Sequence, residues 1–436
     1  MASAFPRVGM GSLVLAFAVP FLFLHIHYQP DLGFSAGGTH VGVWLSDLAV
    51  LGVALAGLAI MASSGPASLR RGVPVWLATA TLFAVVAVSL LYPELRDQPY
   101  DWHVRLVSAL KFFEYAALAL AVPLIVARRG EAVLLFRALI SWSAVATTVG
   151  VLQFLGLISE FQGKRPAQRE PSLVGIHDFA ALSGATLMLG VVALALREPD
   201  LLGRGWMILA FWTGGLGIVV SGAMTAVIGM WLAMALTGVV ASRRRLLPRR
   251  AAALLVIIGV GVTLGTAGMR GTALRDFAAF IGIHRNETPG AVESYAQRTL
   301  LGYIGLKIFL TEPITGVGYQ GSGEEWAYGP QLAAAHRRFP RAPDASFPSP
   351  AHPWGVQSLY LETLADLGLI GAAALAALFA AALWLGLSPG SASPLRLVGV
   401  AWLLIAAGVW IGIGIVPGIP LAALTWLGVG LVTVDD

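Results

Sequence analysis

Guanidinium and imidazole groups gather in one long stretch of this sequence. Guanidinium groups bind phosphate or carboxylate oxygens in bidentate fashion, and an imidazole exchanges a proton near neutral pH. The stretch is therefore suited to hold an anion and to activate a nucleophile. Between positions 270 and 355 its arginines and histidines are Arg270, Arg275, Arg285, Arg298, Arg337, Arg338, Arg341, His284, His336 and His352.

Neither metal nor nucleotide chemistry is expected from the motifs. The chain has no cysteine, which excludes disulfides, iron–sulfur clusters, thiolate zinc sites and cysteine nucleophiles. His336, Asp344 and His352 follow no common metal-ligand spacing. The run Gly316-Val-Gly318-Tyr-Gln-Gly321 has the spacing of a dinucleotide loop, but no strand precedes it and no helix of a βαβ unit follows. We expect no metal and no cofactor.

The elements that must position these groups are membrane-spanning helices. Of the 436 residues, 57% are hydrophobic and 12% are charged, whereas a soluble domain carries about 25% charged residues. One span needs about 20 apolar residues, so the sequence predicts an all-α, polytopic integral membrane protein with about 12 transmembrane helices. The apolar runs are 9–27, 43–63, 74–92, 104–126, 132–157, 178–196, 206–221, 223–241, 251–268, 367–386, 397–414 and 417–433. The first run is expected to be an uncleaved span rather than a signal peptide.

The distribution of arginines predicts the orientation of these helices. Short cytoplasmic loops carry an excess of Lys and Arg, and alternate loops here do so, most clearly at 243–250. Both termini are then cytoplasmic, and the basic residues mark topology rather than a nucleic-acid surface. The predicted division is helices 1–9 at 1–268, one large periplasmic loop at 269–356, and helices 10–12 at 357–436, together forming one membrane domain.

Five stretches, in this order along the chain, resemble the O-antigen ligase and O-antigen polymerase family. Most of the chain is covered, although no single stretch is specific. They are Phe113-Glu114-Tyr115, the run Gly150-Val-Leu-Gln153-Phe-Leu-Gly156, Arg169 before Gly175, the segment from Arg298 to Gly318, and Leu359-Tyr-Leu-Glu362-Thr-Leu-Ala-Asp-Leu-Gly368-Leu-Ile-Gly371.

The resemblance implies a bacterial inner-membrane glycosyltransferase with a GT-C-like fold. Members of this family take a glycan from a polyprenyl-pyrophosphate carrier and pass it to an acceptor at the periplasmic face. The acceptor would be lipid A-core or another envelope molecule in a ligase, and a growing glycan in a polymerase. One large outer loop favours the ligase. The expected partners are this lipid-linked glycan, a glycan or lipid acceptor and membrane lipids, with no nucleic acid.

The resemblance also implies roles for individual residues. The donor pyrophosphate would be bound by Arg169, Arg298, Arg285 and Arg165, because guanidinium groups stabilise the charge of a leaving phosphate. The predicted catalytic base is His352.

Two departures from the family pattern affect these roles. The family usually has His-Asn where this chain has Gln357-Ser358, so Gln357 is a candidate acceptor-site residue that cannot take a proton. The family also tends to have Ser-x-Arg at the outer ends of the seventh and eighth spans. Here Ser221-Gly-Ala-Met-Thr225 lacks the arginine, which is lost or supplied from elsewhere.

Two other classes of function stay open. A transporter would use charged groups inside the spans, and Lys111 and Glu114 share a face of one predicted helix, where we expect them to pair. A noncatalytic relative in an envelope assembly complex would explain the absence of His-Asn.

Overall fold

The computed structural model describes residues 9–36, 39–126, 128–161, 163, 167–280, 295–388, 393–416 and 418–435. The all-α, polytopic fold predicted from the sequence is confirmed. Within the described residues the strands form one short antiparallel hairpin, β1 (Phe34–Ala36) with β2 (Thr39–Val41), in which Phe34 lies opposite Val41.

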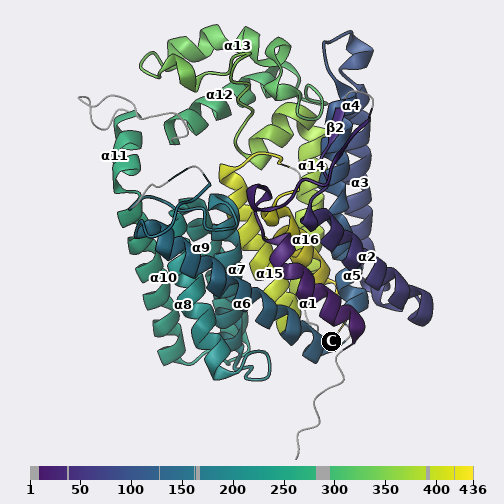
Figure 1. Ribbon diagram of the computed structural model, residues 1–436, viewed down its shortest axis with the longest axis vertical. Coiled ribbons are helices and arrows are strands. Elements are labelled where there is room, and N and C mark those ends of the chain that lie inside the picture. The colour runs from purple at the N-terminus through teal and green to yellow at the C-terminus, as the bar shows by residue number, and fades with distance from the viewer. Residues whose placement is uncertain are drawn as a thin grey trace, which may run out of the picture.

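The helices that precede residue 270 form most of the bundle (Figure 1). They are α1 (Met10–Leu22), α2 (Leu45–Ser64), α3 (Val73–Leu91), α4 (Trp102–Glu114), α5 (Ala116–Ile125), α6 (Arg129–Phe154), α7 (Ile176–Leu196), α8 (Arg204–Ser221), α9 (Met224–Arg243) and α10 (Arg249–Met269). Short 3-10 turns in this part are η1 (Ile26–Tyr28), η2 (Ala67–Gly72) and η3 (Glu94–Arg96).

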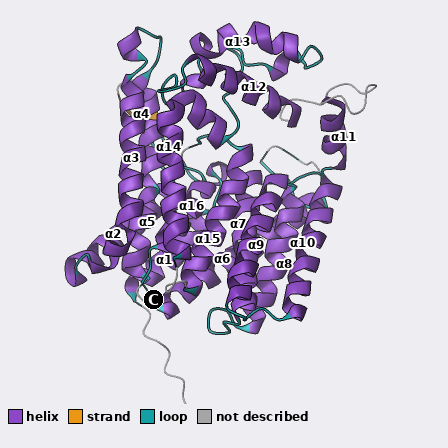
Figure 2. Cartoon of the chain, turned by 180° about the vertical axis from the view of Figure 1, so that it is seen from behind, coloured by secondary structure: helices purple, strands orange, loops and turns teal. Residues whose placement is uncertain are grey.

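The remaining helices are divided between one end of the bundle and its interior. They are α11 (Gly271–Phe280), α12 (Tyr295–Thr311), α13 (Glu325–Arg338), α14 (Leu359–Leu387), α15 (Pro394–Val409) and α16 (Pro420–Val432), with 3-10 turns η4 (Gly321–Gly323), η5 (Asp344–Ser346) and η6 (Trp410–Gly412). Helices α11, α12 and α13, which we call the cap, lie within the predicted large loop. Both views place α12 and α13 over one end of the bundle (Figure 2).

Helix α7 lies in the interior of the bundle. Nearly all its residues are buried, and it packs against α6, α8, α9, α15 and α16. Small residues allow neighbouring helices to approach closely. A Cβ added at Gly408 of α15 would lie 2.7 Å from the Cα of Gly229 of α9, so these two helices pack with their backbones almost in contact.

Ten helices among the described residues are long and apolar enough to cross a membrane. Two further apolar helices, α1 and α16, are shorter. Large apolar side chains on α2, α8 and α10, such as Leu55, Trp212 and Ile257, are exposed, as expected for a surface that faces lipid. The count of about twelve spans stays a prediction.

The charged pair expected on the fourth span is arranged differently. The Nζ of Lys111 lies 2.7 Å from Oδ2 of Asp47 on α2, so Lys111 pairs with a neighbouring helix rather than with Glu114. The apolar run 104–126 is divided into α4, which ends at Glu114, and α5, which begins at Ala116, and together they are long enough for one span. The Lys111–Asp47 ion pair joins two helices and gives no specific support to a transport path.

Candidate functional site

A polar cavity of about 760 Å³ lies between the cap and the bundle. We call it the arginine cavity because Arg169, Arg270 and Arg298 all line it. These side chains come from three separate places: the segment before α7, the residue after α10, and α12. The other polar residues of its lining are His25, Glu160, Gln168, His177, Asp178, Asp276, Gln357 and Glu362.

Arg169 is positioned by a segment that is bonded at several points. The N–H of Ser172 donates to Oε1 of Gln153 at 2.9 Å, and the Ser172 hydroxyl donates to the carbonyl of Ala146 at 2.6 Å. The N–H of Glu170 donates to the carbonyl of Val220 at 3.1 Å. Gln153 belongs to the glycine-flanked run of the fifth predicted span, so that run fixes the segment that carries Arg169.

Arg270 reaches the same cavity beside a glycine at the end of α8. Gly222 has φ +61°, and a Cβ there would lie 3.2 Å from Cβ of Arg169 and 3.3 Å from Cδ of Arg270. The guanidinium of Arg270 also lies 4.8 Å from the ring centre of Tyr295, which is a cation–π contact. Arg270 therefore lies beside Gly222, in the stretch Ser221–Thr225 where the family arginine is missing.

Arg298 is held by two side chains that also line the cavity. Its Nε donates to Oε1 of Gln357 at 3.1 Å, and its Nη2 lies 3.0 Å from Nε2 of His177. A guanidinium only donates hydrogen bonds, so Nε2 of His177 must be the acceptor and the neutral ring must carry its proton on Nδ1. Within the described part of the chain, Nδ1 has no hydrogen-bond partner.

The carboxylates of the cavity are partly used to close helix ends. Asp178 Oδ1 accepts from the N–H of Leu421 at 2.8 Å, near the start of α16. Glu362 Oε2 accepts from the N–H of Ile415, which fixes the turn between α15 and α16. These two acids hold the wall of the cavity, which three guanidinium groups also line.

The glycine-rich segment after α12 packs directly on a kink in α14. Gly316 has φ +67°, and a Cβ there would lie 2.3 Å from the carbonyl carbon of Asp366. Gly368 has φ +62°, and a Cβ there would lie 2.3 Å from the carbonyl oxygen of Ile314. Two of the five stretches that resemble the family therefore form one contact, in which each glycine permits the approach of the other backbone.

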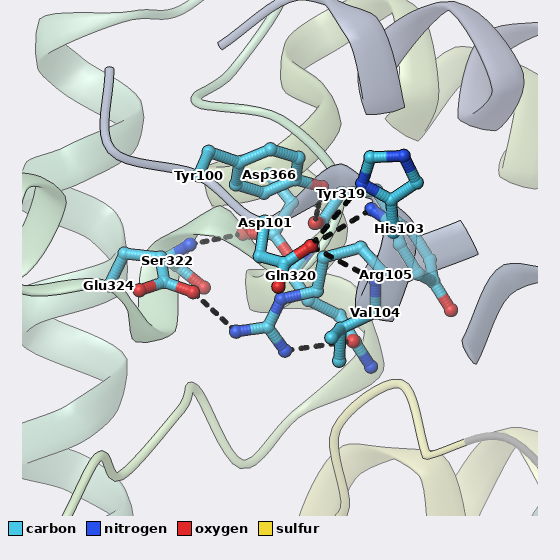
Figure 3. A network of polar contacts seen from close by, with 10 residues as sticks. All are labelled: Tyr100, Asp101, His103, Val104, Arg105, Tyr319, Gln320, Ser322, Glu324 and Asp366. Carbon is cyan, nitrogen blue, oxygen red and sulfur yellow. Dashed lines mark hydrogen bonds and ion pairs between the residues drawn. The ribbon is translucent and has the colours of Figure 1, made fainter. Parts of the chain in front are cut away.

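A polar network joins this contact to α4 (Figure 3). The carboxylate of Asp366 accepts from the N–H of Gln320 at 2.8 Å and from the N–H of Ser322 at 2.9 Å. Arg105 donates to Oε1 of Gln320 at 3.2 Å and forms an ion pair with Glu324. The network attaches the segment between α12 and α13 to α4 and α14.

The structure brings only some of the predicted site residues together. Arg169, Arg298 and Gln357 line the arginine cavity. His352 does not line it: the residue is exposed, its N–H donates to the carbonyl of Ser349 at 2.9 Å, and its ring stacks on Trp354. Arg165 and Arg285 lie outside the described residues.

Arg270 and His177 also line this cavity and are not among the predicted site residues. Arg270 directly follows an apolar run, so its position in the sequence predicts a contact with lipid headgroups. His177 lies at the start of a predicted span, so its position predicts a helix cap. The sequence feature that points to Arg270 is the absence of the family arginine from the stretch around Gly222, which calls for an arginine from elsewhere in the chain. We find no sequence signal that separates His177 from an ordinary interfacial histidine.

The fold defines a polytopic membrane protein with an arginine-lined cavity under a helical cap. Residues 209–376 match the family model described as O-Antigen ligase. This part of the chain includes Arg270, Arg298, Gln357 and both glycine motifs, and the match confirms the resemblance to the O-antigen ligase and polymerase family. It supports a membrane glycosyltransferase-like enzyme that acts on glycan and lipid substrates. No curated protein gives a match to the chain.

One pH-dependent contact borders the cavity. His25 stacks on Phe161 at 4.7 Å between ring centres, and its Nδ1 accepts from the N–H of His27. Burial, followed by the nearby His27, lowers the pKa of His25 from 6.5 to about 4. The unfolded chain therefore binds this proton at a higher pH than the folded protein, and the stabilisation is present above pH 6.5 and lost as the pH falls towards 4.

We expect a His25→Gln variant to lose less thermal stability than the wild type between pH 6.5 and pH 4. The measurement is the melting temperature of the purified protein across this range. His103→Gln, which replaces an exposed histidine on α4, serves as the control and should keep the wild-type profile. Parallel profiles for His25→Gln and the wild type would show that His25 is not responsible.

Proposed function

We propose that this protein transfers a glycan from a polyprenyl-pyrophosphate carrier to an acceptor hydroxyl at the periplasmic face of the bacterial inner membrane. The observation that supports this most is the convergence of Arg169, Arg270 and Arg298 on one cavity. That cavity lies beneath the cap, and two of these arginines lie within the matched residues. A pyrophosphate is the part of the donor that fixed guanidinium groups recognise best.

In the proposed reaction the bond between the anomeric carbon and the pyrophosphate oxygen breaks. Its electron pair stays on the pyrophosphate, where the guanidinium groups stabilise the added charge. The acceptor oxygen bonds to the anomeric carbon and releases its proton to a base or to water. In this proposal arginines, rather than a metal ion, neutralise the leaving group. The prediction that His352 is the base has no support from its position outside the cavity.

His177 has a positioning role in this proposal. It accepts a hydrogen bond from Arg298 and, with Gln357, fixes the plane of that guanidinium. We expect His177→Ala to reduce the rate of transfer by about tenfold to a hundredfold, since an oriented charged donor is lost. His177→Gln keeps an acceptor for Arg298 and should retain most of the activity.

The measurement for this pair is single-turnover transfer in reconstituted membranes, over a range of pH. If His177→Gln were as inactive as His177→Ala, with both proteins folded, His177 would act as the proton acceptor rather than as a positioning residue. A normal rate for His177→Ala would remove the residue from the site.

The orientation follows the predicted distribution of basic residues. Both termini would be cytoplasmic, with 1–268 and 357–436 forming the membrane domain and 269–356 lying in the periplasm. The arginines of 243–250 then lie on the cytoplasmic side, opposite the cap. In this proposed orientation, the arginine cavity would lie where a flipped lipid-linked glycan presents its pyrophosphate.

Ligase activity is preferred over polymerase activity because one outer segment dominates the predicted topology. The experiment that tests the proposal is a gel profile of envelope polysaccharide in a host strain with and without the gene. Long glycan left on its carrier and missing from surface lipid in the deletion strain would indicate a ligase. Acceptor bearing a single repeat unit would indicate a polymerase. An unchanged profile would contradict glycan transfer in that pathway.

A further inference from the structure

A second cavity, of about 950 Å³, adjoins the arginine cavity. The two share Arg298, Gln357 and Gly412 in their linings, so they meet where Arg298 is held. The second cavity is enclosed by α11, α12, the residues that follow α13 and the start of α14. We call it the aromatic cavity.

Five aromatic side chains form a continuous series along this cavity. Ring centres lie 5.9 Å apart for Phe277 and Tyr295, 6.4 Å for Phe277 and Phe280, 5.3 Å for Phe280 and Phe339, and 5.4 Å for Tyr303 and Phe339. Each of these residues is half-buried. They therefore hold one another in place and still present ring surface to the cavity, as a platform for the apolar faces of a ligand.

Within the described part of the chain, the charged residues that line this cavity are all arginines. Arg298 lines its inner end, and Arg338 and Arg341 line it as exposed residues. No carboxylate is found among the described residues that line it, whereas four line the arginine cavity. The guanidinium of Arg338 lies 5.7 Å from the ring centre of Phe339, so the cationic and aromatic parts of the surface are in contact.

This combination fits an anionic saccharide better than a hydrocarbon chain. A polyprenyl chain would desolvate the three guanidinium groups without replacing their hydrogen bonds, which is unfavourable. A sugar presents apolar C–H faces to the aromatic rings and hydroxyl groups to polar partners such as Thr225, Thr299 and Ser358. A phosphate or carboxylate on that sugar would find Arg338 and Arg341.

We propose that the aromatic cavity binds the acceptor saccharide and selects one that carries phosphate or carboxylate groups. This inference rests on the proposed glycan transfer. The acceptor would stack on the aromatic series, with its anionic substituent at Arg338 and Arg341, and would reach the junction at Arg298 with its nucleophilic hydroxyl. The arginine cavity, whose guanidinium groups are less exposed, keeps the pyrophosphate of the donor.

The test is binding of a neutral and a phosphorylated form of one oligosaccharide, in the absence of donor. The probes are chitotetraose and its phosphorylated form, titrated against the full-length protein in phosphatidylcholine nanodiscs. We expect the phosphorylated form to bind about tenfold more tightly or better, because charge-assisted hydrogen bonds are added. The double variant Arg338→Gln, Arg341→Gln should lose this preference. Arg337→Gln, an exposed neighbour that lines neither cavity, should keep it.

Equal affinity for the two probes, or a preference that survives the double variant, would overturn the inference. The same titrations are repeated in nanodiscs that contain the anionic lipid phosphatidylglycerol. If this lipid abolished the preference in the wild type, the arginines would bind a lipid headgroup, which also overturns the proposal. Because binding is measured without donor, a failure of glycan transfer would count against the proposed function alone.

Discussion

Arg298→Gln is expected to lower glycan transfer by about a hundredfold or more, because it removes a fixed charge that would act on the leaving pyrophosphate. Arg298 lines both cavities, and it is held by His177 and Gln357. The neutral amide of glutamine is shorter and cannot reproduce the fork of donors. The measurement is the initial rate of transfer in reconstituted membranes, at saturating acceptor.

Arg337→Gln is the matched control for this substitution. Arg337 is an arginine of the cap that is exposed and lines neither cavity, so the same change of charge there should leave the rate within about twofold, as is usual for exposed sites. If Arg298→Gln retained the wild-type rate while folded, the arginine cavity would not be the donor site.

Gly316→Ala is expected to destabilise the protein strongly. The new Cβ would lie 2.3 Å from the carbonyl carbon of Asp366, and the residue has φ +67°. Neither backbone is able to move without opening the contact between the segment after α12 and the kink of α14. Backbone strain and overpacking each cost about 1–3 kcal/mol, and here they act together. The measurement is thermal stability of the purified protein in detergent.

Gly65→Ala separates the two causes. Gly65 also has a positive φ of +79°, but nothing lies within 4 Å of its added Cβ. It should therefore show the cost of backbone strain alone, and its melting temperature should fall less than that of Gly316→Ala. A smaller effect at Gly316 than at Gly65 would mean that the segment after α12 does not pack closely on α14.

The membrane fold could be predicted because each predicted span corresponds to a long apolar run in the sequence. The division of a span into two helices and the pairing of charges between spans could not be predicted. The run 104–126 gives no sign that α4 ends at Glu114 and that α5 begins at Ala116. It also gives no sign that Lys111 forms an ion pair with Asp47 on α2 rather than with Glu114. These choices depend on which helices are neighbours, and periodicity within one helix does not contain that information.

The site residues also divide into those that could be predicted from their own stretch of sequence and those that depend on how the helices pack. Arg169, Arg298 and Gln357 lie in stretches that resemble the family, and the cavity contains all three. His352 is the histidine nearest in sequence to the position where the family usually has His-Asn. This residue forms an isolated bridge with Ser349 and is not among the residues that line the cavity. Arg270 and His177 join the site only through the packing of α7, α8 and α12, which no single segment specifies.

The most direct test of the account is transfer by the purified protein in nanodiscs, supplied with a polyprenyl-pyrophosphate-linked glycan and an acceptor. The account predicts acceptor whose mass has increased by that of the glycan, together with one polyprenyl pyrophosphate released for each acceptor modified. It also predicts that both products are lost together in Arg298→Gln. Donor that remains intact with a folded wild-type protein and a competent acceptor, or release of the carrier that is unchanged in Arg298→Gln, would contradict the central claim.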